Sequence, residues 1–280
     1  MKYLVVGAKG QLGQELVKLL SERNLDFVAY GSSALDITDR NKVLEVFKSE
    51  QPNVILDAAA YTAVDNAEDE GKDVNWLVNA EGSKNLAEAA KEIGATLIYV
   101  STDYVFNGIK SDFYLENDIV NPQNEYGKSK LAGEYAIATS GAKYYIVRTS
   151  WVFGEFGNNF VYTMQRLGSK LEKLSVVNDQ HGRPTWTRTL SEFMIHLTNV
   201  EAEYGIYHLS NDGEATWYEF ANEILKDVDV TVEPVSSEQF PTKAYRPENS
   251  VMNLTKAKAT GFKIPSWQEA LQMFKDSISQ

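Results

Sequence analysis

Short apolar runs alternate with amphipathic stretches through the first half of the chain. Leu12, Leu16, Leu19 and Leu20 recur at helical spacing and predict a helix over 11–20. Further helices are expected over 43–47, 76–91 and 126–138. Uninterrupted apolar runs are typical of buried strands, which we expect over 3–6, 27–30, 54–60, 96–100 and 144–147. The alternation predicts a Rossmann-like α/β fold, a doubly wound parallel sheet covered by helices on both faces.

The alternation loosens after residue 150. Strands over 175–177 and 206–210 and helices over 188–198, 216–226 and 266–277 are expected, whereas the Pro- and Ser-rich stretch 234–250 is expected to be a loop. No repeat or flexible linker separates the two parts. We therefore expect a first domain over 1–150, to which part of 172–200 returns, and a smaller C-terminal α/β lobe formed mostly by 151–280.

Composition narrows the classes of function. The chain has 280 residues, a formal net charge of −12 and no cysteine, which excludes disulfides and thiolate catalysis. No run of Lys and Arg suggests binding to nucleic acid. No window approaches the roughly 18 apolar residues of a membrane span, and the N-terminus lacks the features of a signal peptide. We expect a cytoplasmic protein that binds neither nucleic acid nor membrane.

A glycine loop follows the first predicted strand and opens the first predicted helix. Gly7, Gly10 and Gly13 are spaced GxxGxxG. Residues without Cβ allow a sharp turn and a close approach of the backbone to a pyrophosphate. The N-terminus of the helix offers N–H donors and a partial positive charge for the phosphates. This loop predicts nucleotide binding.

The end of the second predicted strand bears on cofactor choice. A carboxylate there would hold the 2′-hydroxyl of NAD and repel the 2′-phosphate of NADP, but Tyr30 is followed by Gly31, Ser32 and Ser33. Lys9 or the two serines could hold the extra phosphate, so we expect both NADPH and NADH to bind. Asp36, a few residues later, fits a helix-capping role and an adenine contact equally well.

Tyr126 and Lys130 lie four residues apart at the start of a predicted helix, and therefore on one face. An ammonium beside a phenol lowers the phenolic pKa from about 10, which would suit a general acid or base. The spacing alone is as typical of a surface pair. However, Thr102 lies at the end of a predicted strand, where ligands bind in open parallel sheets. Thr102 could hydrogen-bond a carbonyl oxygen that Tyr126 protonates.

The glycine loop, the strand-end hydroxyl and the YxxxK pair together resemble the short-chain dehydrogenase/reductase family. The chain is most similar to its extended branch, and within that branch to the dTDP-4-dehydrorhamnose reductases. The matching stretches follow in order along nearly the whole chain: GAKGQLGQEL (7–16), DAAAYTAVDNAE (57–68), STDYVFNG (101–108), NEYGKSKLAGE (124–134), VRTSWVFG (147–154), NNFVYTM (158–164), VVNDQHGRPT (176–185) and RPENSVMNL (246–254).

The resemblance implies NAD(P)H-dependent reduction of the 4-keto group of dTDP-4-dehydro-β-L-rhamnose, a nucleotide-sugar. It implies that 1–150 binds the cofactor and that 151–280 mostly binds substrate. Thr102, Tyr126 and Lys130 would be catalytic, and Asp103 and Trp151 would contact the sugar with Thr102 and Tyr126. Trp151 fits a core position as well, and Arg246 fits either a diphosphate contact or a salt bridge. The implied cofactor contacts are Gly7, Gly10, Gln11, Leu12, Gly13, Asp36, Ile37, Ala60, Tyr61, Thr62, Tyr126 and Lys130.

Some relatives bind a divalent metal through glutamates at a dimer interface. Glu15 matches one such position, and Glu192 and Glu269 are candidates for the others. The sequence leaves open whether a metal binds and whether the protein is a monomer or a homodimer. Two other functions stay open. One is a related nucleotide-sugar reductase or epimerase, and the other is a non-catalytic regulatory subunit similar to that of methionine adenosyltransferase.

Overall fold

A six-stranded parallel sheet forms the centre of the computed structural model, which describes residues 1–279. The strand order is β10-β5-β4-β3-β1-β2, and every neighbouring pair is parallel. The strands are β1 (Lys2–Val6), β2 (Asp26–Tyr30), β3 (Val54–Asp57), β4 (Thr96–Thr102), β5 (Lys143–Thr149) and β10 (Gly205–His208). The predicted doubly wound α/β fold is confirmed.

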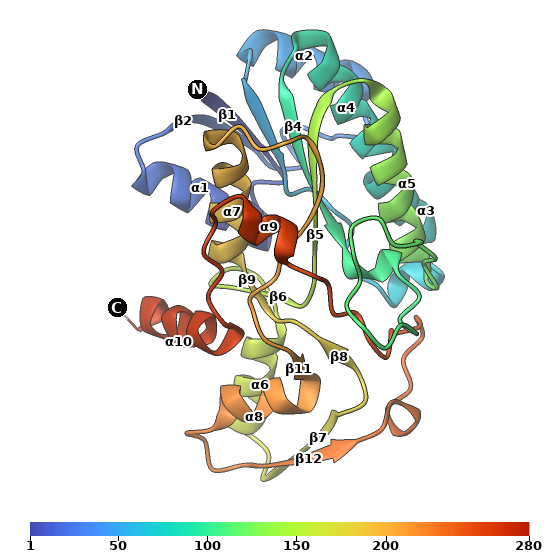
Figure 1. Cartoon of the computed structure of the whole chain (residues 1–280), viewed down its shortest axis with the longest axis vertical. Coiled ribbons are helices and arrows are strands. Elements are labelled where there is room, and N and C mark those ends of the chain that lie inside the picture. Colours follow the sequence, from blue (N-terminus) through green and yellow to red (C-terminus); the bar gives the residue numbers. More distant parts are fainter. Residues whose placement is uncertain (280) are drawn as a thin grey trace.

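Helices cover both faces of this sheet (Figure 1). Tyr3 and Val5 of β1 face one side, in a core with α1 (Gln11–Glu22) and α7 (Thr187–Asn199). Leu4 and Val6 face the other side, in a core with α2 (Arg40–Glu50), α4 (Ser83–Ile93) and α5 (Glu125–Ser140). Because both faces are buried, the inner strands carry apolar residues on both faces, which is why they contain continuous apolar runs.

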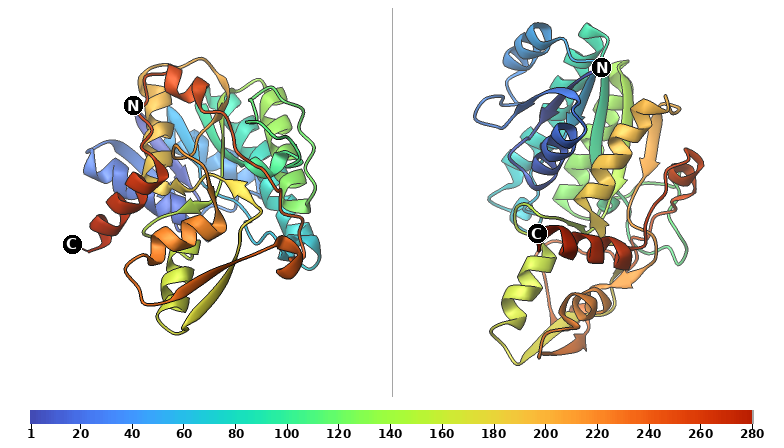
Figure 2. Two further views of the ribbon diagram at one scale, coloured as in Figure 1. Left: turned by 60° about the horizontal axis from the view of Figure 1, so that its bottom comes forward. Right: turned by 90° about the vertical axis from the view of Figure 1, so that its left-hand side faces the viewer.

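A smaller lobe lies beyond one end of the sheet (Figures 1 and 2). Its core is formed by residues between Phe153 and Phe274, with aromatic contacts among Phe153, Phe160 and Phe220. Its helices are α6 (Phe160–Gly168), α8 (Trp217–Leu225) and α10 (Trp267–Ile278). Its strands are β6 (Val152–Phe153), β7 (Lys173–Val177), β8 (His181–Gly182), β9 (Thr185–Trp186), β11 (Ala215–Thr216) and β12 (Thr231–Val235). The chain crosses between the two parts, since α7, β10 and α9 (Thr255–Ala259) lie with the large sheet.

Several predicted elements differ in the structure. The strand expected over 54–60 ends at Asp57, so 58–60 leave the sheet as a loop. The helix expected over 76–91 is α3 (Lys72–Trp76), a π-helical stretch η2 (Leu77–Gly82) and then α4. The loop expected over 234–250 was partly wrong, because its first two residues belong to β12 and Ser237–Gln239 form a 3₁₀ helix, η4. Helix α6 was not predicted, although Asn159 is a typical N-cap and accepts the N–H of Tyr162.

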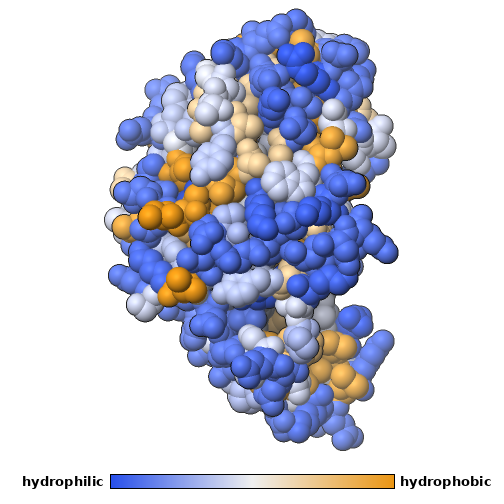
Figure 3. Space-filling model, turned by 90° about the vertical axis from the view of Figure 1, so that its right-hand side faces the viewer, coloured by the Kyte–Doolittle hydropathy of each residue, from blue (hydrophilic) through white to orange (hydrophobic). Residues whose placement is uncertain are grey.

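The outer surface is mostly polar, as the acidic, polar composition of the chain leads one to expect. The face drawn in Figure 3 is mostly hydrophilic, with apolar side chains gathered in a few patches. Across residues 1–279, none of the helices has both the length and the apolar character needed to cross a membrane.

Candidate active site

A cavity of about 460 Å³ opens where β3, β4 and β5 end, between the sheet and the smaller lobe. It brings together residues from most of the motifs that the sequence suggested. It is lined by Gly10, Gln11, Leu12, Asp57, Ala58, Ala59, Ala60, Thr62, Val64, Val100, Ser101, Thr102, Asp103, Tyr104, Tyr126, Lys130, Thr149, Ser150, Trp151, Val152, Asn158, Leu190 and Trp217.

One wall of this cavity is formed by the middle of the glycine loop, Gly10, Gln11 and Leu12, whereas Gly7 and Gly13 are not part of the lining. Gly7 has a φ of 73°, and a Cβ there would lie 2.6 Å from the backbone nitrogen of Ala59. A Cβ on Gly13 would lie 2.1 Å from the carbonyl oxygen of Gly7. Gly10 is the N-cap of α1, whose first turn contains no acidic residue. The loop is therefore tightly folded and leaves the N–H groups of α1 open to an anionic group, which fits a dinucleotide pyrophosphate.

The segment after β2 lies outside the cavity lining. The side chain of Lys9 lies over Gly31, where a Cβ would come within 3.0 Å of its Cδ, and Ser32 and Ser33 are exposed. Asp36 caps its own turn, because its Oδ1 accepts the backbone N–H and the hydroxyl of Thr38 at 2.9 and 2.8 Å. Ile37 is buried against Gly82. Both remain predicted adenine contacts.

Some residues of the loop after β3 line the cavity, and others make hydrogen bonds within the protein. Ala60 and Thr62 line the cavity. Tyr61 does not: its backbone N–H donates to Asn79 Oδ1 at 2.9 Å, and its hydroxyl accepts from Asn66 Nδ2 at 2.8 Å. These bonds tie Tyr61 to Asn79 and Asn66, and its cofactor contact stays a prediction.

Thr102, Tyr126 and Lys130 all line the same cavity. Thr102 is the last residue of β4, and the other two lie in the first turns of α5. Asn124 begins α5 by accepting the N–H of Gly127 at 2.7 Å. Gly127 lets the helix approach β4, since a Cβ there would lie 2.3 Å from the Tyr104 carbonyl oxygen. The helix start is thus fixed against the strand end, which brings the three side chains together.

The predicted effect of Lys130 on Tyr126 was wrong. Burial, with the nearby charge of Asp103, raises the pKa of Tyr126 above its ordinary value, while a hydrogen bond with Thr102 acts in the opposite direction. Lys130 is buried, and its Nζ lies 4.0 Å from the centroid of the Tyr99 ring. Burial lowers the pKa of Lys130, opposed by the charges of Asp57 and Glu134. The Lys130 charge is therefore shared with Asp57 and Tyr99 rather than directed at the phenol.

Two buried carboxylates line the cavity with incomplete hydrogen bonding. Asp57 Oδ2 and Asp103 Oδ2 have no partner among the described residues. Asp103 Oδ1 accepts the Thr102 hydroxyl at 3.1 Å, and burial raises the pKa of Asp103 to about 6. Asp57 was not predicted as a site residue, although a carboxylate that ends the apolar run VIL was a visible signal. Unpaired buried oxygens at a cavity wall are suited to receive donors from a ligand.

Aromatic residues of the smaller lobe form the opposite wall. Trp151 has a φ of 47° and stacks on Trp217, with ring centroids 3.7 Å apart and an interplanar angle of 11°. A bulky residue with positive φ is unusual and is held here by packing. Trp217, the first residue of α8, was not predicted, because nothing in the local sequence places it beside Trp151.

A second cavity of about 220 Å³ adjoins the first at Trp217. Its lining includes Phe160, Met164, Phe240 and Arg246. Arg246 Nη2 donates to Asp65 Oδ2 at 2.8 Å, so it does form the salt bridge that the sequence allowed. Its Nη1 is buried without a partner among the described residues.

The chain matches the family model described as the RmlD substrate binding domain over residues 1–279. It belongs to this family. Among its curated relatives, a dTDP-4-dehydrorhamnose reductase from Aggregatibacter actinomycetemcomitans is 42% identical and is aligned over 97% of each chain.

Solved members of the RmlD family have the same fold. The dTDP-4-dehydrorhamnose reductase from Bacillus anthracis, solved in complex with NADP, is 42% identical with a TM-score of 0.95 over 99% of each chain. The enzyme from Clostridium acetobutylicum is 42% identical with a TM-score of 0.96 over 100% of each chain. The predicted family resemblance is confirmed.

In the part of the chain that the structure describes, the glutamates suggested as metal ligands do not gather around one point. Glu269 is separate, because it caps α10 by accepting the Ser266 N–H and hydroxyl, each at 2.8 Å. Glu15 and Glu192 both contact Arg188 instead. Within residues 1–279, no three His, Cys, Asp or Glu side chains gather so as to hold a metal ion. The donor set therefore does not fit a divalent cation.

Proposed function

We propose that this chain is an NADPH-dependent oxidoreductase that reduces the 4-keto group of dTDP-4-dehydro-β-L-rhamnose to give dTDP-β-L-rhamnose. One observation carries the proposal. The strand-end Thr102, the Tyr126–Lys130 pair and the glycine loop share a single cavity, in a chain whose full-length relatives are named for this reaction. The enzyme acts in the cytoplasm, as a monomer or a homodimer, in dTDP-rhamnose biosynthesis.

The cofactor belongs in the wall formed by the glycine loop. Gly10, Gln11 and Leu12 line the cavity at the start of α1, where N–H groups can bind the pyrophosphate. The absence of a carboxylate at Gly31, and the Lys9 side chain lying over it, favour the 2′-phosphate of NADPH. When bound, the nicotinamide supplies the hydride that reduces the ketone carbon. Lys130 is assigned to the nicotinamide ribose.

Side chains of the protein protonate the ketone oxygen and hydrogen-bond to it. Tyr126 donates a proton to it, and the raised pKa keeps the phenol protonated, which is the form that a reduction requires. Thr102, whose hydroxyl donates to Asp103 Oδ1 when no substrate is bound, turns this hydrogen toward the same ketone oxygen. Lys130 lines the same cavity beside Asp57 and Tyr99, and its part is to hold the nicotinamide ribose rather than to change the acidity of the phenol.

The substrate extends from the first cavity into the second. Asp103 and Trp151 contact the sugar, because both line the catalytic cavity. Phe160, Trp217 and Phe240 provide an apolar, aromatic lining suited to a nucleobase. Arg246 lines the second cavity, and its unpaired Nη1 is available to the diphosphate. On this proposal, residues 1–150 mainly bind the cofactor and residues 151–280 mostly bind the substrate.

The test is an assay of NADPH absorbance with dTDP-4-dehydrorhamnose and with other dTDP- and UDP-linked ketosugars. We expect stoichiometric consumption of NADPH and a product with the rhamno configuration by NMR. Sugar conversion without net oxidation of NADPH would instead indicate an epimerase. Reduction of a different ketosugar only would reassign the substrate. If no ketosugar is reduced and a stoichiometric partner copurifies, the chain is a regulatory subunit.

A further inference from the structure

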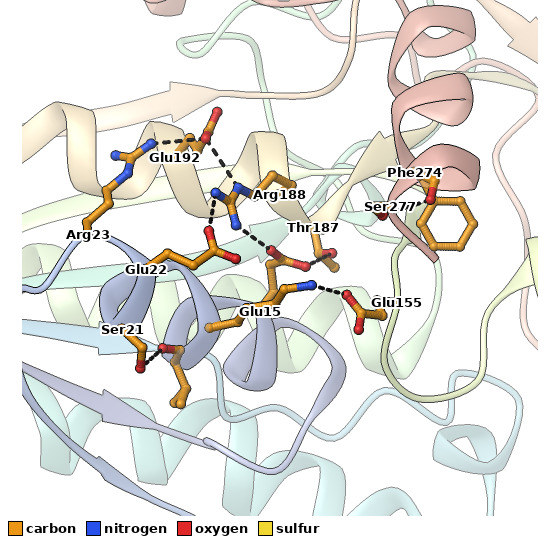
Figure 4. Close-up of polar contacts among 12 residues, drawn as sticks. Glu15, Ser21, Glu22, Arg23, Glu155, Thr187, Arg188, Glu192, Phe274 and Ser277 are labelled. Atoms are coloured by element: carbon orange, nitrogen blue, oxygen red, sulfur yellow. Dashed lines mark hydrogen bonds and ion pairs between the residues drawn. The ribbon is translucent and has the colours of Figure 1, made fainter. Parts of the chain in front are cut away.

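Three glutamates from two helices converge on one arginine at the interface between α1 and α7 (Figure 4). Glu15 and Glu22 come from α1, and Glu192 comes from α7, one turn after Arg188. The guanidinium of Arg188 contacts all three carboxylates. Its Nη1 lies 3.4 Å from Glu15 Oε1, its Nη2 lies 2.5 Å from Glu22 Oε2, and its Nε lies 3.2 Å from Glu192 Oε1.

The innermost carboxylate is fully enclosed by this arrangement. Glu15 is 3% exposed, and its second oxygen, Oε2, accepts the Thr187 hydroxyl at 3.2 Å. Glu192 receives a second cation, because Arg23 Nη2 lies 3.0 Å from its Oε1. Burial raises the pKa of Glu15, while the charge of Arg188 and their hydrogen bond lower it. Two guanidinium groups thus serve three carboxylates within a single chain.

The shape of the guanidinium accounts for this arrangement. Arginine presents five N–H donors in a rigid planar fork, so one side chain can serve several carboxylates at once. A divalent cation needs several oxygens to converge at about 2.0–2.6 Å from one point. Here the guanidinium already lies between the carboxylates, at the point where their oxygens would have to meet.

We propose that Arg188 takes the place of a divalent cation in this glutamate cluster, so that the α1–α7 interface is held by an internal charge and binds neither Mg²⁺ nor Mn²⁺. The arrangement also supports the site. Helix α1 carries the glycine loop at its N-terminus, whereas α7 is anchored in the core through Leu190 and Phe193. Arg188 therefore fixes the helix that presents the loop to a helix that is buried against the sheet.

Thermal unfolding of the full chain, freed of metal with EDTA, tests the proposal without reference to activity. MgCl₂ or MnCl₂ is compared with KCl at equal ionic strength. We expect no shift in the Tm of the wild type. Arg188→Ala lowers the Tm and frees the carboxylates, so Mn²⁺ should then raise the Tm of this variant by roughly 2–4 °C. Arg23→Ala, which removes the outer cation but keeps Arg188, is the matched control and should show no such gain.

Two further measurements complete the test. The double variant Arg188→Ala/Glu15→Gln should lose the response to Mn²⁺, because the enclosed ligand has been neutralised. Mn²⁺ binding to the wild type, followed by electron paramagnetic resonance, decides the matter if Arg188→Ala fails to fold. Stoichiometric Mn²⁺ binding by the wild type would overturn the proposal. So would a folded Arg188→Ala variant whose Tm does not change when Mn²⁺ is added. Neither result bears on which sugar the enzyme reduces.

Discussion

Two buried charged regions beside α5, the cavity carboxylates and the Glu134–Arg148 pair, are organised in opposite ways. At the cavity, Asp57 and Asp103 each leave one carboxylate oxygen without a partner among the described residues. One turn beyond Lys130, the Glu134 carboxylate is bound at both oxygens by Arg148, with Nε–Oε1 at 2.9 Å and Nη2–Oε2 at 2.7 Å. Both side chains of this pair are 3% exposed.

This difference in hydrogen bonding distinguishes charged groups that stabilise the fold from charged groups that can bind a ligand. A buried polar atom without a partner costs free energy, and at a cavity wall a bound ligand can supply that partner. Glu134 and Arg148 satisfy each other and contribute no atom to the cavity lining. Asp57 and Asp103 line the cavity, and one oxygen of each carboxylate has no hydrogen-bond partner among the described residues. Breaking the Glu134–Arg148 pair should therefore lower stability, whereas changing Asp57 or Asp103 should lower activity.

Tyr126→Phe is expected to have the largest effect on activity. Removing the hydroxyl leaves the ring packing intact but deletes the proton donor, so kcat should fall by about 10²–10⁴-fold. NADPH binding, measured by fluorescence, should persist. Tyr135→Phe is the matched control, because Tyr135 lies on the same helix but is 58% exposed. Unchanged turnover in Tyr126→Phe would remove this residue from the mechanism.

Elements of the large sheet could be predicted because each is defined by local pattern. The strands are apolar at successive positions, and Leu16, Leu19 and Leu20 repeat on one face of α1. The proposed catalytic set is also recognisable locally, since Tyr126 and Lys130 are one helical turn apart and Thr102 ends a strand. Family resemblance added the cofactor, the sugar and the direction of the reaction.

What depended on tertiary packing could not be predicted. The β12 strand forms only because residues 231–235 pair with β7, far earlier in the chain. Trp217 meets Trp151 across 66 residues of sequence. The side chain of Lys130 lies against Tyr99, on a strand that the sequence could identify but not orient toward it. The pKa of Tyr126 follows burial and Asp103, neither of which is visible in the YxxxK spacing.

Arg148→Met should have the largest effect on stability. The substitution keeps an apolar stem but leaves Glu134 buried without its partner, which should lower the free energy of unfolding by about 3–5 kcal/mol. Urea denaturation measures the change. Lys173→Ala removes the partner of Glu233 in an exposed ion pair, with the two side chains 58% and 43% exposed. That control should cost no more than about 1 kcal/mol. Equal losses in both variants would contradict the distinction between the two regions.

Asp103→Asn should stabilise the protein while it impairs catalysis. Burial raises the pKa of Asp103 from 3.8 to about 6 in the folded chain. Above pH 6 the native state therefore carries a carboxylate that is less favourable than in the unfolded chain, and stability is regained as the pH falls through 6 toward 4. A neutral amide of the same shape removes this penalty at pH 8. A difference of about two pKa units corresponds to a gain of at most about 3 kcal/mol.

The sign of this effect distinguishes the cavity from an ordinary buried pair. Urea denaturation of Asp103→Asn and wild type at about pH 8 should show the variant to be more stable, and the difference should vanish near pH 4, where the wild-type carboxyl is protonated. Asp229→Asn, at an exposed position, should change stability little at either pH. A variant less stable than wild type at pH 8 would mean that Asp103 holds the fold as Glu134 does, and that its unpaired oxygen is not kept for the sugar.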